Sequence, residues 1–201
     1  MYEKHKIVPL IAIALIAVAC GSSVPQADVD AANAALETAS ADDASVYAPE
    51  AYTAAQDAKN ALDAEMKAQA GSFSAFRSYT KATELAASAK SAAEKAGQEA
   101  AAGKEAARND ATTIIADART TLTEARALLS KAPRGKGTQA DLAALNADLL
   151  GAEMMLAQAE TELGAGRYNE AKVKAEASKT ASAGVATAVQ GAMAARKGRP
   201  V

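Results

Sequence analysis

Large side chains are scarce in this chain of 201 residues. It has no tryptophan, two phenylalanines and five tyrosines, whereas 58 of its residues are alanine. More than half of its hydrophobic content is therefore single methyl groups, and burial at roughly 25 cal/mol per Å² gives each methyl only a small share of the stability. We do not expect a globular enzyme with a thick aliphatic and aromatic core.

Groups that could catalyse a reaction are equally scarce. The single histidine, His5, and the single cysteine, Cys20, both lie close to the N-terminus. Loss of His5 with a signal peptide would leave no imidazole for acid–base chemistry near neutral pH. Gly135-Lys136-Gly137-Thr138 lacks the earlier glycine and the strand of a phosphate-binding loop, so we interpret it as a surface turn. The sequence predicts no enzymatic activity and no cofactor. A metal site made only of carboxylates stays open, although solvated charge explains the carboxylates better.

A surplus of positive charge is absent as well. The chain carries 22 basic and 24 acidic residues, and removal of residues 1–19 would leave 20 against 23, because Glu3, Lys4 and Lys6 go with them. Nucleic-acid binding usually requires a basic face that neutralises phosphates. We therefore expect no nucleic-acid partner.

The N-terminus has the pattern of a bacterial export signal. Lys4, His5 and Lys6 precede an apolar run of 13 residues, 7–19, which is too short to span a bilayer as a mature helix. Ala17-Val18-Ala19-Cys20 resembles a lipobox, in which a signal peptidase cuts before a cysteine that carries acyl chains. This resemblance implies a signal peptide at 1–19 and lipid attachment at Cys20. An ordinary secretory signal followed by a free thiol is the alternative.

Lipid on Cys20 would make the membrane the first partner of the mature chain. Several acyl chains on one residue give stable attachment. In similar lipoproteins an aspartate after the cysteine favours the inner membrane, and Gly21 stands there instead, so we expect the periplasmic face of the outer membrane. Residues 20–28, which are mostly small or polar and include Pro25, are predicted to form a flexible tether.

The rest of the chain predicts helices. Alanine has the highest helix propensity, and Leu, Met, Glu, Lys, Gln and Arg follow closely. Breaks at 42–45, 71–72, 132–137 and 164–166 separate five expected helices, with Pro49 in the first turn of the second and Tyr168 opening the fifth. The third, at 73–131, would be a central spine of about 58 residues and roughly 87 Å.

Small apolar residues repeat along these helices at alternating intervals of three and four, the spacing of a coiled-coil seam. The long helix carries one seam at 79–100 and another at 111–129, and the two do not share a register. We expect the seam to shift near Gly103, where the helix passes from one set of partners to another. Further seams run along 142–163 and 168–192.

These observations predict an all-α fold, an elongated Ala-rich antiparallel bundle of coiled-coil-like hairpins around one long central helix. We expect an N-terminal bundle at 29–131 that includes the long helix. A C-terminal hairpin at 132–195 would pack on that helix, and a basic tail would follow at 196–201.

An internal duplication is one interpretation of the helix pairs. Placing Gly71-Ser72-Phe73 over Gly166-Arg167-Tyr168, an offset of 95, aligns two glycine turns, each with an aromatic residue at the entrance to the next helix. Ala-rich helices align with each other at almost any offset, so this point stays open.

Two short motifs resemble a known family. Tyr47-Ala48-Pro49-Glu50 before an Ala-rich helix, and Gly166-Arg167-Tyr168-Asn169-Glu170-Ala171 at a helix turn, are similar to motifs of the bacterial exported family called domain of unknown function 4398. The resemblance covers roughly residues 27–102 and implies an α-helical exported module without any implied activity. The second motif also resembles a tetratricopeptide turn, although the 34-residue repeat of that family is absent.

Two features could contact a partner. Six aromatic residues of the mature chain are expected to plug the ends of the bundle or, alternatively, to form a docking patch. They are Tyr47, Tyr52, Phe73, Phe76, Tyr79 and Tyr168. Arg134, Lys136 and the tail at 196–199 are basic, which suits a helix C-terminus without any ligand and would also suit anionic lipid or a cell-wall polymer.

The favoured function is that of a lipid-anchored structural or interaction lipoprotein of the cell envelope, with an envelope protein or a cell-wall polymer as its partner. The alternative is a periplasmic binding or chaperone-like adaptor for a polypeptide or a lipid, with a groove between the two helical bundles. Homo-oligomerisation along an exposed seam also stays open, because Ala-rich helices with few large core residues can be only marginally stable alone.

Overall fold

The computed structural model describes residues 23–134 and 138–197, and every regular element in these ranges is helical, which confirms the all-α fold. The elements are α1 (Gln26–Ala41), α2 (Ala44–Tyr47), α3 (Pro49–Gly71), a 3-10 helix η1 (Ser74–Phe76), α4 (Thr80–Ser130), α5 (Gln139–Gly164) and α6 (Tyr168–Lys197). The predicted signal peptide at 1–19, Cys20, Lys136 and residues 198–201 lie outside the described residues.

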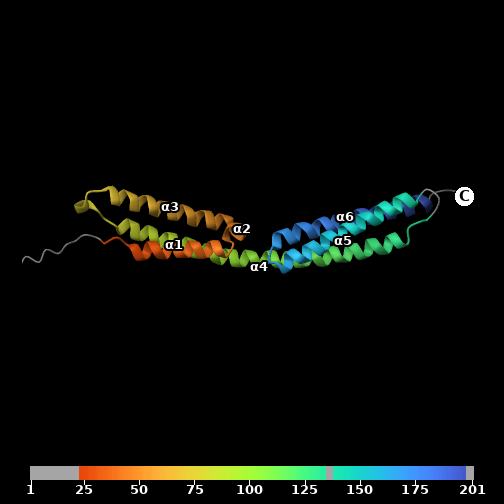
Figure 1. Cartoon of the computed structure of the whole chain (residues 1–201), viewed down its shortest axis with the longest axis horizontal. Coiled ribbons are helices and arrows are strands. Elements are labelled where there is room, and N and C mark those ends of the chain that lie inside the picture. The colour runs from red at the N-terminus through yellow and green to blue at the C-terminus, as the bar shows by residue number, and fades with distance from the viewer. Residues whose placement is uncertain (1–22, 135–137, 198–201) are drawn as a thin grey trace, which may run out of the picture.

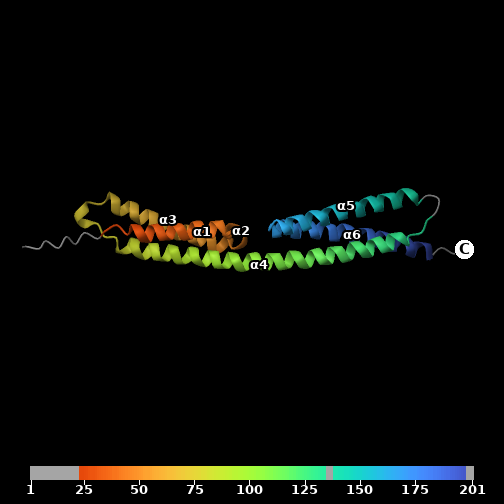
Figure 2. The ribbon, with the colours of Figure 1, turned by 60° about the horizontal axis from the view of Figure 1, so that its bottom comes forward.

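The helices form an elongated rod around α4 (Figures 1 and 2). At 51 residues, α4 is about 77 Å long at a rise of 1.5 Å per residue. We call its first half together with α1, α2 and α3 the N-terminal unit, and its second half together with α5 and α6 the C-terminal unit. In both units one partner helix, α1 or α6, runs in the direction of α4, and the other, α3 or α5, runs against it (Figure 1).

The long helix is shorter at its start than the sequence predicts. We expected it to run over 73–131, whereas α4 begins at Thr80 and residues 73–79 form η1 and a turn. Side chains compete with the helical backbone in this segment. Arg77 donates to the carbonyl oxygens of Ser72 and Ala70, and Gln69 Oε1 accepts from the backbone N–H of Ser78. These hydrogen bonds satisfy backbone carbonyl and N–H groups that would pair with each other in a continuous helix.

Two predicted boundaries also shift outward. The tether was expected to reach residue 28, but α1 begins at Gln26, since the Asp28 and Val29 N–H groups bond to Pro25 O and Gln26 pairs with Asp30 one turn on. The basic tail was expected from residue 196, but α6 continues through Lys197. Nothing in the sequence between Tyr168 and Lys197 breaks a helix strongly enough to end it earlier.

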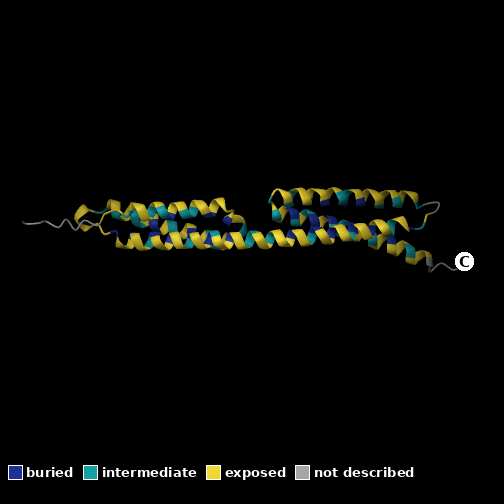
Figure 3. Ribbon diagram, turned by 90° about the horizontal axis from the view of Figure 1, so that it is seen from below, coloured by how far each residue is buried: buried dark blue, intermediate teal, exposed yellow. Residues whose placement is uncertain are grey.

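The predicted seams form the core of both units, and Figure 3 shows buried residues between the helices and exposed ones on the outside. In the first half of α4 and just before it, the buried seam is Tyr79, Ala82, Ala86, Ala89, Ala93, Ala96 and Ala100. In its second half the buried seam is Ala111, Ile115, Ala118, Leu122 and Ala125. The one seam residue that fails is Ala192, which is exposed, whereas Met193 packs against the core instead.

Corresponding positions of the two units are buried or half-buried. Tyr79, Ala82 and Ala86 at the start of the α4 seam correspond to Tyr168, Ala171 and Ala175 of α6, always 89 positions later. The other two helices match as well. Val29, Ala32, Leu36 and Ala39 of α1 lie 86 positions before Ile115, Ala118, Leu122 and Ala125 of α4, and Ala55, Ala58 and Leu62 of α3 lie 94 positions before Leu149, Ala152 and Leu156 of α5.

The units are therefore two tandem three-helix modules in which α4 serves as the last helix of the first module and the first helix of the second. The offset of 95 proposed from the sequence nearly fits α3 and α5 but pairs Phe73 with Tyr168. The structural counterpart of Tyr168 is Tyr79, because the turn before α4 is longer than the turn before α6.

Candidate functional surfaces

The two units meet where α2 crosses the middle of α4, at Gly103. A Cβ atom on residue 103 would lie 2.4 Å from the backbone oxygen of Tyr47, so only glycine permits this approach. The α4 seam also shifts here. Continuing the intervals of three and four beyond Ala100 would put a seam residue at position 110, whereas the buried residue is Ala111. The predicted handover of partners near Gly103 is thereby confirmed.

Tyr47 links the two units across this junction. Its hydroxyl lies 3.4 Å from the carbonyl oxygen of Gly166, in the turn between α5 and α6, and its ring centroid is 6.4 Å from that of Tyr168. Gly166 has a φ of 78°, which glycine adopts without steric cost. The aromatic residues predicted to plug bundle ends thus include two that close the inner ends of the units against each other.

Lys104 supports the same junction from α4. Its Nζ lies 2.7 Å from Asp43 Oδ2 and 5.7 Å from the centroid of the Tyr47 ring. The hydrogen bond to Asp43 raises the pKa of the Lys104 ammonium, against a smaller opposing effect of desolvation. Asp43 has a φ of 61°, a left-handed conformation in which aspartate is better tolerated than most residues. The spacing of the seam predicted a change at Gly103, whereas no sequence pattern pointed to Lys104 and Asp43, which lie 61 positions apart.

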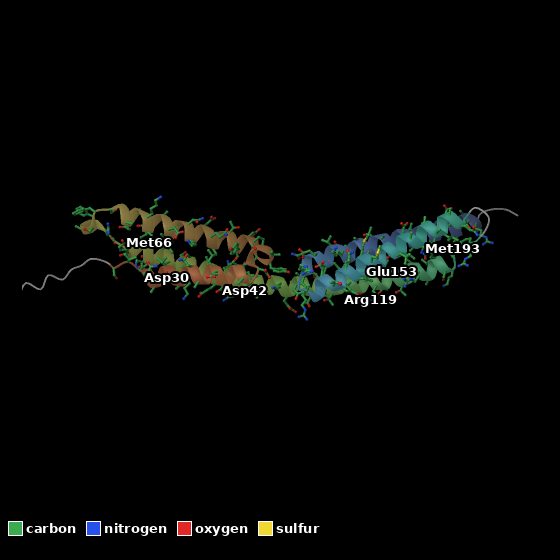
Figure 4. All side chains as sticks on the ribbon, viewed as in Figure 1. Asp30, Asp42, Met66, Arg119, Glu153 and Met193 are labelled. Atoms are coloured by element: carbon green, nitrogen blue, oxygen red, sulfur yellow. The ribbon has the colours of Figure 1, made fainter. Side chains whose placement is uncertain are left out.

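Ion pairs fix how α5 and α6 lie along α4. A guanidinium nitrogen of Arg119 on α4 lies 2.6 Å from Glu160 Oε1 on α5 (Arg119 is labelled in Figure 4). Asp117 of α4 pairs with Lys179 of α6 at 2.8 Å, and Asp110 pairs with Lys172 one heptad earlier at 3.5 Å. Such exposed pairs contribute only about 0–1 kcal/mol each, so we assign them to alignment more than to stability.

A groove opens at the far end of the C-terminal unit. Its volume is about 450 Å³, and its lining includes the half-buried side chains of Leu142 and Leu145. Arg134, before α5, and Arg196, in the last turn of α6, both line it together with Asp141. The structure thus brings together two of the basic residues that the sequence analysis singled out. This groove lies at the end of the rod, whereas the adaptor hypothesis placed one between the two bundles.

Tyr52 of α3 is half-buried against the core cluster that contains Ala55. The other three aromatic residues lie at the opposite end of the rod and separate into two kinds. Tyr79 is 6% exposed and lies in a core cluster with Leu62 and Ala82, as the prediction of plugging requires. Phe73 and Phe76 are 72% and 81% exposed, so they do not plug the bundle. The prediction was wrong for these two because the helix it placed them on does not form, and η1 carries them outward instead.

Chemistry-bearing groups do not converge elsewhere in the described ranges. Of the carboxylates expected on a solvated face, Asp141, Asp148 and Glu160 are exposed, whereas Glu153 and Glu162 are half-buried. Among residues 23–134 and 138–197, no group of three or more His, Cys, Asp or Glu side chains is placed to hold a metal ion. None of the helices described combines the length and apolar character needed to cross a bilayer.

Comparisons with known proteins give no relative to draw on. No family model matches the chain, and no curated protein or solved structure matches it significantly.

Proposed function

We propose that this protein is a lipid-anchored rod of the cell envelope, a structural or interaction module without catalytic activity. The observation that carries the proposal is the geometry: a continuous helix of 51 residues, about 77 Å long, joins two modules end to end. The described chain enters at one end of this rod with Ser23, three residues after Cys20, and the groove lined by Arg134 and Arg196 lies at the other.

In this proposal the acyl chains on Cys20 hold one end of the rod at the periplasmic face of the outer membrane. The other end then presents its surface to an envelope protein or a cell-wall polymer. Membership of the family called domain of unknown function 4398, which no family model supports, stays a proposal and would supply no activity. Homo-oligomerisation remains part of the proposal for the assembled state, to be measured by sedimentation.

The anchor is tested by Cys20→Ala in cells, with Ser22→Ala as the matched control. We expect the Cys20 variant to leave the membrane fraction and the control to stay there, with unchanged helical circular dichroism for both purified proteins. A Cys20→Ala protein from which the signal peptide has been removed and which still stays in the membrane fraction would contradict the anchor. The mass of the N-terminal peptide should show acyl chains in the unaltered protein and in the control.

The adaptor function is the second candidate, and the groove at the far end favours it. Leu142 and Leu145 beside two arginines suit a ligand with an apolar chain and an anionic head, such as a fatty acid. Binding should raise the melting temperature with ligand concentration. The rise should be smaller for a variant with Arg134→Gln and Arg196→Gln, and absent for an uncharged alcohol of equal chain length. No rise with the fatty acid would remove this candidate.

A further inference from the structure

Phe73 and Phe76 form an exposed aromatic pair at one end of the rod. Their side chains are 72% and 81% exposed, and their ring centroids lie 6.1 Å apart. Exposed large apolar groups that gather in one place mark a surface that contacts something else more often than do single scattered ones. Tyr79, six residues after Phe73, is buried, so a hydrophobic core is available at this end of the rod. Phe73 and Phe76 stay outside that core.

The loop that carries the pair is held in place by a network of polar groups. Lys81 of α4 pairs with Glu65 of α3 at 2.9 Å, and Gln69 donates to Glu65 at 2.8 Å. Gln69 in turn accepts from the Ser78 N–H, and Arg77 donates to Ser72 O and Ala70 O at the end of α3. The outward position of the two rings is therefore built into the loop.

This end of the rod is also the end at which the described chain begins. Val29, in the first turn of α1, packs against the same core cluster as Met66, near the end of α3, and Tyr79, which precedes α4. Figures 1 and 2 show the start of α1 and the turn between α3 and α4 at the same end. Cys20 precedes Gln26 by six residues, which can span at most about 20 Å when fully extended.

We propose that Phe73 and Phe76 insert into the surface of the lipid bilayer that holds the acyl chains of Cys20. The inference rests on the lipid anchor proposed above. A bilayer is the occupant that the short reach from Cys20 brings to this loop, and phenylalanine is among the apolar residues that membrane-surface segments bury at the boundary between headgroups and acyl chains. The acyl chains and the ring pair then form two contacts, which restrict the angle of the rod to the membrane in a way that a single tether cannot.

The absence of tryptophan from the chain gives a direct test. Phe76→Trp places one fluorophore on the loop, and Met154→Trp places one at a position of α5 that is 63% exposed, on the C-terminal unit. Each lipidated, purified protein is reconstituted into phosphatidylcholine vesicles, with or without bromine on the acyl chains. We expect a blue-shifted emission at position 76 that brominated lipid quenches, and neither effect at position 154. Adding Phe73→Ser to the Phe76→Trp protein should weaken the quenching, and circular dichroism should show both variants folded.

The outcomes separate the inference from the anchor. Acylated protein in which brominated lipid leaves position 76 unquenched would overturn the inference and leave the anchor standing. A blue shift at position 76 without quenching would do the same, because a second copy of the chain would then cover the rings. Equal quenching at positions 76 and 154 would also overturn it, since the rod would then lie flat on the membrane. An N-terminal peptide without acyl chains would overturn the anchor, and the inference with it.

Discussion

Gly103→Ala is the sharpest test of how the two units are joined. The new Cβ would lie 2.4 Å from Tyr47 O and 3.3 Å from both the carbonyl carbon and the Cβ of Tyr47. Real Cβ atoms do not approach other atoms as closely as 2.4 Å, and the first two obstructing atoms belong to the backbone. Relief therefore requires α2 to move away from α4. That movement would also carry the Tyr47 hydroxyl away from Gly166 O, which is already 3.4 Å distant.

Two opposing effects set the magnitude. Alanine favours an α-helix over glycine by about 1 kcal/mol in a helix interior. Overpacking a close contact typically costs about 1–3 kcal/mol, so the net effect of Gly103→Ala should be a destabilisation of up to about 2 kcal/mol. Gly97→Ala is the matched control on the same helix, because its Cβ would meet the nearest atoms, on Asp42 and Ala39, at 3.8 and 3.9 Å. It should stabilise the protein by up to about 1 kcal/mol.

Urea unfolding followed by circular dichroism measures both changes through the denaturation midpoint. The two identical substitutions should move the midpoint in opposite directions, Gly97→Ala upward and Gly103→Ala downward. A Gly103→Ala protein as stable as the Gly97→Ala protein would refute the close contact between α2 and α4. The aromatic junction between the two units would then need another explanation.

Two further predictions concern buried and charged polar groups. Ser178 Oγ donates 2.7 Å to Ala152 O in the core between α5 and α6, whereas the equally buried Ser182 Oγ has no partner among the described residues. Ser178→Ala should therefore lower the free energy of unfolding, measured in urea, by about 1 kcal/mol, whereas Ser182→Ala should leave it unchanged or raise it. Equal decreases for the two variants would contradict this prediction. Lys81, then Gln69, lowers the pKa of Glu65 by hydrogen bonding, so this network stabilises the fold at and above the ordinary value of 4.5 and loses its effect as the pH falls through the lowered pKa. In the Glu65→Gln variant the melting temperature should therefore decrease less steeply as the pH is lowered below 4.5. The same decrease in the variant and in the unaltered protein would contradict this role of Glu65.

Local interactions made most of the helical architecture predictable from the sequence. Helix propensity and the alternating three- and four-residue spacing depend only on neighbours along the chain, so Tyr79 to Ala100 and Ala111 to Ala125 could be identified as seams. The shift near Gly103 followed from the same pattern. The segment at 73–79 escaped this reasoning, because side-chain bonds from Arg77 and Gln69 override a helix propensity that nothing in the pattern opposed.

Only the tertiary structure decided which distant residues meet. Lys104 and Asp43, or Arg134 and Arg196, lie far apart in sequence, and no periodicity says that they share a junction or a groove. The equivalence of Tyr79 and Tyr168 likewise became visible only once the unequal turns before them were in place. Propensity and spacing act over a few residues and therefore determined the helices, whereas contacts between helices depend on turn geometry and close approach, which the folded chain alone sets.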